Sequence, residues 1–276
     1  MVVPRNEAVL SGAAAEPLVA VLRRDRDIIL SGLVGVTALA WLYLLYLAWG
    51  VQTMDMGSVG MGAAMPQLRP WTAVDFVLMF LMWAVMMVAM MVPTAAPMIL
   101  TFAAIRRKRH EQQGPFVPTS VFVLAYMVIW AGFSALATLA NWALHRDGFM
   151  TSMTGSTLPL VGGFFLAGAG VFQWTPLKHA CLRRCRTPLG FLMTEWREGR
   201  RGAFIMGLRH GTFCVVCCWA LMALLFVLGV MNLVWVAALA AFVLLEKVAP
   251  SRLRVSHVSG TFLIVWGAWM IGSTIS

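Results

Sequence analysis

The sequence predicts an all-α protein, a polytopic transmembrane helical bundle of about seven spans with a cytoplasmic N-terminus. Composition is the first observation: 61% of the 276 residues are hydrophobic and only 12% are charged, which ordinary soluble domains do not show. Second, apolar segments long enough to cross about 30 Å of hydrocarbon recur along the chain. Third, when successive loops are placed on alternate sides, 19 of the 21 Lys and Arg residues fall on one side, as cytoplasmic loops require.

The chain begins with a polar segment, residues 1–27, which carries four arginines and is predicted to be a cytoplasmic tail. Residues 28–276 form the predicted transmembrane helical domain. Its first apolar run, residues 28–49, is too long for a signal-peptide core and no small-residue cleavage site follows, so we expect an uncleaved anchor helix. The next segment, residues 51–70, is a loop rich in glycine and methionine on the outer side.

The second span, residues 71–105, contains Pro93 and Pro97. Because proline removes a helical hydrogen bond, these residues predict that the helix bends or ends there. A basic run at 106–109 follows directly and marks the inner side. The third span covers residues 120–144.

Four glycines in the fourth span, residues 158–174, allow close contact with a neighbouring helix. The longest basic connection, residues 175–202, is predicted to be an inner loop. A very short turn at Gly229 makes the two spans on either side of it antiparallel neighbours. The last three spans are residues 203–230, 232–248 and 258–275.

The fifth span carries a group of soft metal ligands, His210, Cys214, Cys217 and Cys218. On a helix, His210, Cys214 and Cys217 project within about 60° of one another, and Cys218 lies at the edge of the same face. Thiolates with an imidazole suit Cu(I) or Zn(II). The alternative is that these cysteines pack as small hydrophobic side chains.

A methionine stripe runs along the second span. Met79, Met82, Met86 and Met90 lie on one helical face, with Asp75 one turn before Met79. Thioethers are neutral soft ligands that bind Cu(I) without bringing charge into the membrane. A carboxylate at membrane depth is costly and usually functional. The alternative is that methionine fills gaps in a packed bundle.

The outer loop repeats this pattern with four methionines, Met54, Met56, Met61 and Met65, and with Asp55 between the first two. A loop exposed to water has no packing reason to hold so many thioethers. We therefore expect the loop to capture a soft metal. The alternative is a partly buried loop that covers the bundle.

The inner loop holds His179, Cys181 and Cys185. The two cysteines are four residues apart, so they share a face if this piece is helical. Nearby arginines and Lys178 favour the thiolate form, and His179 could join as a third ligand. The alternative is an interfacial helix with snorkelling basic residues and incidental thiols.

Glu246 is a further candidate ligand near the inner end of the sixth span, level with the start of the fifth. The alternative for Glu246 is a local ion pair with Lys247 or Arg209. His145 and His257 flank spans singly and are expected only to lie at the membrane interfaces.

Three segments in this order form a recognisable pattern, and with them the chain resembles a bacterial family of predicted metal-binding integral membrane proteins, defined as a domain of unknown function. The resemblance extends from about residue 71 to the C-terminus and implies a membrane-embedded metal site. The segments are Met86–Pro93, Gln173–Lys178 with Cys181 and Cys185, and Gly207–Met222.

These observations predict a multi-pass inner-membrane protein that handles or delivers copper as Cu(I), with zinc as the alternative metal. Its environment is the lipid bilayer, with a periplasmic or membrane partner subunit; nucleic acid is excluded because the +10 net charge is confined to particular loops. Whether the chain is an enzyme stays open. The alternatives are a subunit of a copper-dependent membrane oxidase or monooxygenase, a thiol–quinone oxidoreductase using Cys214 and Cys217, and a structural subunit.

Overall fold

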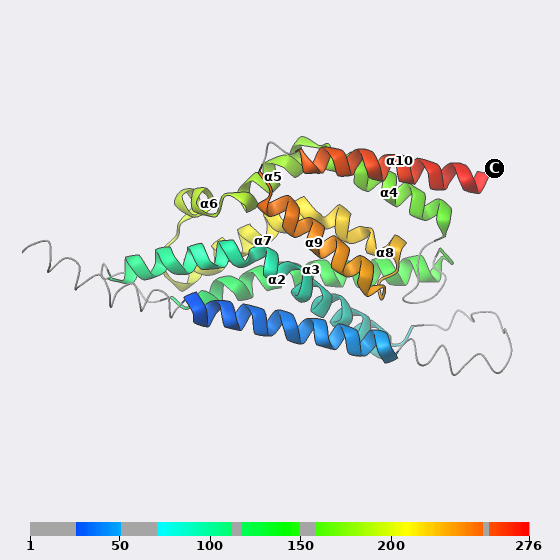
Figure 1. Cartoon of the computed structure of the whole chain (residues 1–276). Coiled ribbons are helices and arrows are strands. Elements are labelled where there is room, and N and C mark those ends of the chain that lie inside the picture. The colour runs from blue at the N-terminus through cyan, green and yellow to red at the C-terminus, as the bar shows by residue number, and fades with distance from the viewer. Residues whose placement is uncertain (1–25, 51–70, 112–116, 150–157, 251–253, 276) are drawn as a thin grey trace, which may run out of the picture.

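The computed structural model describes residues 26–50, 71–111, 117–149, 158–250 and 254–275, and these are helical, with no strand among them (Figure 1). The predicted tail at 1–27 and the outer loop at 51–70 therefore fall almost entirely outside the described residues. In chain order the helices are a first helix at Arg26–Gly50, α2 (Ala73–Glu111), α3 (Thr119–Arg146), α4 (Pro159–Gln173), α5 (Pro176–Arg186), α6 (Pro188–Glu195), α7 (Gly199–Ala223), α8 (Leu225–Leu228), α9 (Leu233–Val248) and α10 (Val255–Ile275).

The all-α membrane fold is confirmed. In the described part of the chain, five helices are long and apolar enough to cross a membrane, and six if α4 and α5, bent by 66° from each other, form one broken span. All seven predicted segments are helical, but α9 has only 16 residues. At 1.5 Å per residue it reaches about 24 Å, short of a full hydrocarbon core. The count of seven spans and the cytoplasmic N-terminus therefore stay predictions.

The second helix is continuous through both of its prolines. Figure 1 shows α2 changing direction midway, so Pro93 and Pro97 bend the helix and do not end it. The helix also continues beyond the predicted end at residue 105, through the basic run, to Glu111. Long basic side chains can reach water from a helix that extends past the membrane.

The predicted inner loop at 175–202 contains two short helices. Thr175 caps α5 by accepting a hydrogen bond from the backbone N–H of Lys178 at 3.3 Å, and Pro176 occupies the first turn. Pro188 likewise occupies the first turn of α6, where Thr187 precedes it without a side-chain capping hydrogen bond. Proline fits this position because its missing N–H would have no helical partner there. The helix α5 packs against α7.

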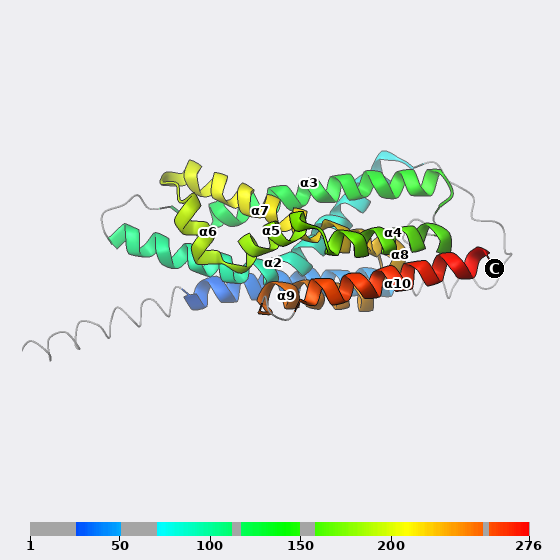
Figure 2. The same ribbon diagram turned by 90° about the horizontal axis from the view of Figure 1, so that it is seen from above.

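Glycines bring α4 and α10 into close contact, and the two helices lie side by side in both views (Figures 1 and 2). A β-carbon at Gly170 would lie 2.7 Å from the backbone oxygen of Gly260, and one at Gly163 would lie 3.0 Å from that of Gly267. Because lipid is as apolar as the side chains, such close backbone packing is what holds membrane helices together. Of the four glycines predicted to allow helix contact in the fourth span, Gly163 and Gly170 therefore have this role, whereas Gly168 faces open space.

The turn at Gly229 reverses the chain between α8 and α9. Its φ of 88° lies in the left-handed region, which glycine adopts without strain. The fifth and sixth predicted spans are therefore antiparallel neighbours, as expected. The return along α9 brings the residues before Ala249 back to the middle of α7, where the cysteines lie.

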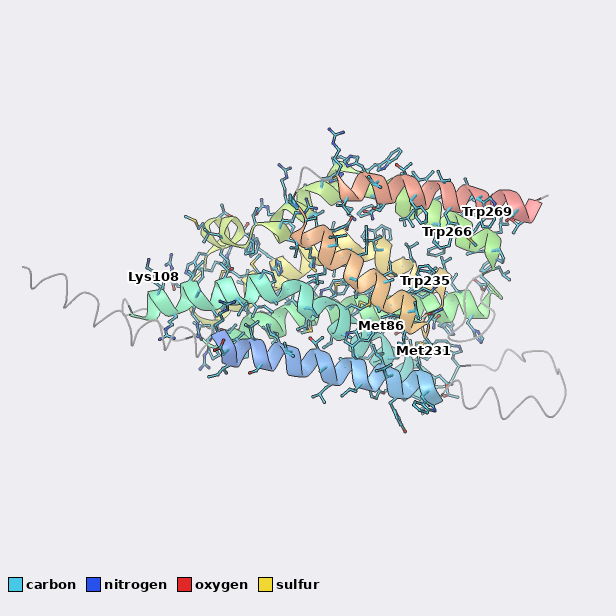
Figure 3. The ribbon with its side chains drawn as sticks, in the orientation of Figure 1. Met86, Lys108, Met231, Trp235, Trp266 and Trp269 are labelled. Carbon is cyan, nitrogen blue, oxygen red and sulfur yellow. The ribbon has the colours of Figure 1, made fainter. Side chains whose placement is uncertain are left out.

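The basic segments gather at one end of the bundle. In Figure 1 the start of the first helix, the end of α2, α5, α6 and the start of α7 share that end, whereas the end of α3, the start of α4 and the C-terminus lie at the other. Figure 3 places Lys108 at the first end and Met231 and Trp269 at the second. This distribution agrees with the charge pattern in the sequence.

Candidate metal centre

Four thiols from two helices meet in the interior of the bundle. Cys214, Cys217 and Cys218 come from α7, and Cys185 comes from α5. The sulfur atoms of Cys217 and Cys218 are 3.3 Å apart, and those of Cys185 and Cys217 are 4.0 Å apart. Cys214 interacts with the other three thiols. We call these four side chains the thiol cluster. All four are buried and none forms a disulfide.

A buried lysine completes the surroundings of Cys214. The ammonium group of Lys247, on α9, donates to Cys214 Sγ at 3.1 Å and to Thr94 Oγ1 at 2.7 Å. The hydroxyl of Tyr126, on α3, lies 3.1 Å from the same sulfur. A cation inside a membrane bundle normally faces a partner charge or a functional site. Here the partner is a thiol, which the positive charge stabilises as thiolate.

His210 lies in the interior, one turn before Cys214, and does not face lipid. Its ring stacks on Phe122 and Tyr126, with ring centroids 6.0 and 5.5 Å away, and packs against Phe191. Its Nδ1 atom is buried and has no hydrogen-bond partner among the described residues. Such an atom is rare in a folded protein and marks a place that a ligand could fill.

The ligands are not arranged around a ready-made metal position. Within the described ranges, no group of three or more His, Cys, Asp or Glu side chains is placed to hold one ion. Joint coordination by His210, Cys214 and Cys217 therefore stays a prediction. The burial of Cys214 and Cys217, which are 0% and 1% exposed, argues against thiol exchange with a soluble partner.

The methionine stripe of α2 lies in the core. Met79, Met82, Met86 and Met90 are buried, with Met87 and Met91 beside them, and Figure 3 shows Met86 in the interior near α9. We call these six side chains the methionine column. Tyr126 connects the inner end of this column to the thiol cluster. Its hydroxyl lies 3.1 Å from Cys214 Sγ and also donates to the backbone oxygen of Met91 at 3.3 Å.

Asp75 caps the outer end of the same helix. Its Oδ2 accepts hydrogen bonds from the backbone N–H and the hydroxyl of Thr72, both at 2.7 Å, and the Thr72 hydroxyl accepts from the Asp75 N–H at 3.4 Å. This reciprocal arrangement is a capping box. The capping accounts for a carboxylate at this position. The first sulfur of the column, Met79 Sδ, accepts from Asn141 Nδ2 at 3.2 Å. Met54, Met56, Met61 and Met65 lie outside the described residues.

A second buried polar cluster lies beside the first. Lys178 Nζ, with its side chain 0% exposed, donates to both oxygens of Glu246 at 2.9 and 2.8 Å and also binds the amide oxygen of Gln173. Ser256 donates to Glu246 Oε1 at 2.8 Å. The alternative considered for Glu246, an ion pair with Lys247 or Arg209, is wrong, because Lys247 turns toward Cys214 and Arg209 pairs with Glu195.

The two cysteines of α5 have different surroundings. The predicted helical spacing is confirmed and both are buried, but only Cys185 joins the thiol cluster. His179 stacks on His257, with ring centroids 4.7 Å apart. His257 therefore has a second imidazole beside it, and its expected position at a membrane interface stays a prediction. Tyr126 was not a sequence candidate, and Lys247 was considered only as a possible ion-pair partner of Glu246; a lysine within an apolar segment was the signal that could have identified Lys247 as part of the site.

The chemistry of this interior favours a soft monovalent ion. Thiolates and thioethers prefer Cu(I), and a single lysine offsets the negative charge that deprotonated thiols would bring into the bundle. Two sulfurs 4.0 Å apart, as in Cys185 and Cys217, can both reach one ion at about 2.3 Å. The residues present therefore fit copper as cargo.

A family model described as PpoB2, a copper chaperone, matches residues 80–270, about two thirds of the chain, whereas no curated protein and no solved structure matches. The matched residues include the thiol cluster and both buried lysines but not the first helix or the outer loop. With the apolar helices, the match fits a membrane protein that handles copper. The chain belongs to the PpoB2 family of copper chaperones.

Proposed function

We propose that the chain is an inner-membrane copper chaperone that takes up Cu(I) from the outer side, holds it at the thiol cluster and passes it on. The observation that carries this proposal is the convergence of four buried thiols from α5 and α7 on one place, with the ammonium group of Lys247 3.1 Å from Cys214 Sγ. A purely structural core has no need of a lysine beside a thiol, because burying the charge is costly.

The holding step depends on two or three of the cysteines. Cu(I) replaces protons on the thiols as it binds, so its affinity rises with pH. Small rotations of the side chains of Cys185, Cys214 and Cys217 would bring their sulfurs to bonding distance from one Cu(I) ion. His210 Nδ1 or Cys218 would be a further ligand. The charge of Lys247 then balances part of the negative charge of the copper–thiolate group.

The uptake step uses thioethers. The methionine column runs from Met79 to Met91, about 18 Å along the helix. Because thioethers are neutral and bind Cu(I) weakly, an ion can move between them without being trapped. The outer-loop methionines would capture the ion and pass it to the outer end of the column.

Metal stoichiometry tests this function. Purified protein loaded with Cu(I) under reducing conditions should hold about one ion per chain at the thiol cluster. Changing Cys185, Cys214, Cys217 and Cys218 together to serine should remove that ion, because serine keeps the size and loses the soft donor. Cys181→Ser is the matched control, since Cys181 is buried on α5 but is not hydrogen-bonded to these thiols.

Copper retained by the four-serine variant at wild-type affinity would contradict the proposal. Equal loss of copper from the Cys181→Ser control would also contradict it, because the effect would then come from a general change in packing. Copper-edge X-ray absorption of the loaded protein measures the number of sulfur atoms bound to the ion and their distances from it.

A further inference from the structure

A basic pocket lies beside the second buried cluster, where α5 meets the start of α10. Its volume is about 200 Å³, and its polar lining consists of Arg183, Arg186, Arg254, His179, His257 and Ser256. No carboxylate lines the pocket within the described residues. Nothing in the proposed copper path uses these side chains, and the pocket is therefore a separate feature.

Two of the three arginines that line the pocket are free to bind a ligand. Arg183 and Arg254 form no ion pair with any residue that the structure describes, and Arg186 is fixed at the wall because its Nε donates to the backbone oxygen of Glu246 at 2.6 Å. The nearby carboxylate of Glu246 is already neutralised by Lys178. The positive charge of the pocket is therefore not balanced from within.

One atom of the lining lacks a partner. The Nε2 atom of His179 is buried and has no hydrogen-bond partner in the described part of the chain. Its ring lies on that of His257, so the two imidazoles present their edges together. A buried polar atom without a partner is uncommon and indicates a ligand that supplies one.

The location of the pocket indicates which anion it meets. It lies where α4 ends and the chain bends by 66° into α5. Trp174, at this bend, is half exposed and its Nε1 donates to the backbone oxygen of His257 at 3.1 Å. Tryptophan is enriched at the level of lipid headgroups, and basic pockets between helices at that level bind headgroup phosphates.

We propose that this pocket binds a phosphate group, in the membrane the phosphodiester of an anionic phospholipid. Arginine suits this ligand because its planar guanidinium donates two parallel hydrogen bonds to phosphate oxygens. Inorganic phosphate shares this chemistry and is the other source that the pocket could accept. The proposal does not depend on copper.

The test measures binding by thermal stabilisation of the full chain in a neutral detergent at constant ionic strength. The three probes are short-chain phosphatidylglycerol, short-chain phosphatidylcholine and inorganic phosphate. Arg183→Gln with Arg254→Gln is the pocket variant, and Arg200→Gln with Arg201→Gln is the matched control, because it removes the same charge from exposed residues at the start of α7.

We expect phosphatidylglycerol to stabilise the wild type and the control equally and to bind the pocket variant about tenfold or more weakly. Stabilisation by inorganic phosphate at similar concentration, lost in the same variant, would assign the site to free phosphate and still support the pocket. Equal losses in the control, or equal stabilisation by phosphatidylcholine, would overturn the proposal. If the glutamine variant does not fold, Arg183→Lys with Arg254→Lys keeps the charge, and we expect it to bind phosphatidylglycerol more weakly than the wild type. Unchanged binding would overturn the role of the guanidinium groups.

Discussion

Replacing Lys247 with methionine distinguishes an effect on copper binding from an effect on the stability of the fold. The ammonium group donates to Cys214 Sγ at 3.1 Å and to Thr94 Oγ1 at 2.7 Å, and the side chain is only 8% exposed. Methionine has nearly the same length and no charge. In the metal-free protein, Cys214 can respond by keeping its proton, so no unpaired charge is left behind.

The two states of the protein should therefore respond differently. Replacing a buried charge with an apolar group of similar size is often neutral or stabilising, so we expect the free energy of unfolding of the metal-free variant to fall by no more than about 1 kcal/mol. The copper-loaded state loses a hydrogen bond to a charged sulfur, worth about 1.5–3 kcal/mol. At about 1.4 kcal/mol per tenfold change, Cu(I) affinity should weaken about 10- to 150-fold.

The assay is competition for Cu(I) with a chromogenic chelator, using purified protein in detergent, together with unfolding of the metal-free protein. Lys108→Met is the matched control, because it makes the same substitution at the exposed end of α2 (Figure 3). If Lys247→Met and Lys108→Met bind Cu(I) equally well, Lys247 does not act on the copper site and the reasoning is refuted.

Three further predictions concern packing, capture and topology. Gly170→Ala should lower the free energy of unfolding by about 1–3 kcal/mol, because its β-carbon would lie 2.7 Å from the backbone oxygen of Gly260, whereas Gly168→Ala, with nothing within 4 Å, should have little effect in the same unfolding assay. Changing the four methionines of the 51–70 loop to leucine should weaken Cu(I) uptake at low copper and leave thermal stability unchanged; unaltered copper dependence would mean that the loop only covers the bundle. Reporter fusions after residues 60 and 112 should report opposite sides of the membrane, and the same side for both would contradict the charge-based topology.

Hydropathy predicted the helices well because each apolar segment must be long enough to bury its own backbone hydrogen bonds in lipid. The bend of α2 and the turn at Gly229 also followed from local chemistry. The helix α6 was missed, and α5 was considered only as a possible helix around Cys181 and Cys185, since both are short and lie in a basic stretch with weak hydropathy. Their starts were nevertheless encoded in the Thr175–Pro176 pair and in Pro188.

The site was only partly predictable. Helical spacing correctly placed Cys214, Cys217 and Cys218 on a buried face, because it depends on the helix alone. The approach of Cys185 and Lys247 depends on how α5 and α9 pack on α7, which local spacing does not contain. Asp75 shows the opposite case, since its capping box with Thr72 was readable from the sequence but was not considered there; its role as a metal ligand stays a prediction.

Glu246 and Lys247 connect the two buried clusters. They are consecutive on α9 and project about 100° apart, so one reaches Lys178 on α5 and the other reaches Cys214 on α7. Because Lys178 and Cys185 share α5, the ion pair fixes the helix that supplies the fourth thiol.

Lys178→Met should therefore weaken Cu(I) binding although Lys178 is not itself a sulfur ligand. The variant leaves Glu246 buried and uncompensated, which should destabilise the protein by about 3–5 kcal/mol in an unfolding assay. Adding Glu246→Gln removes the negative charge of Glu246 and should restore most of that stability. The double variant still lacks the ion pair between α5 and α9. If the ion pair positions Cys185, the double variant should be stable, bind Cu(I) more weakly than the wild type, and show fewer thiolate sulfurs at the ion by X-ray absorption. A stable double variant with wild-type affinity and an unchanged spectrum would show that packing alone holds α5 in place.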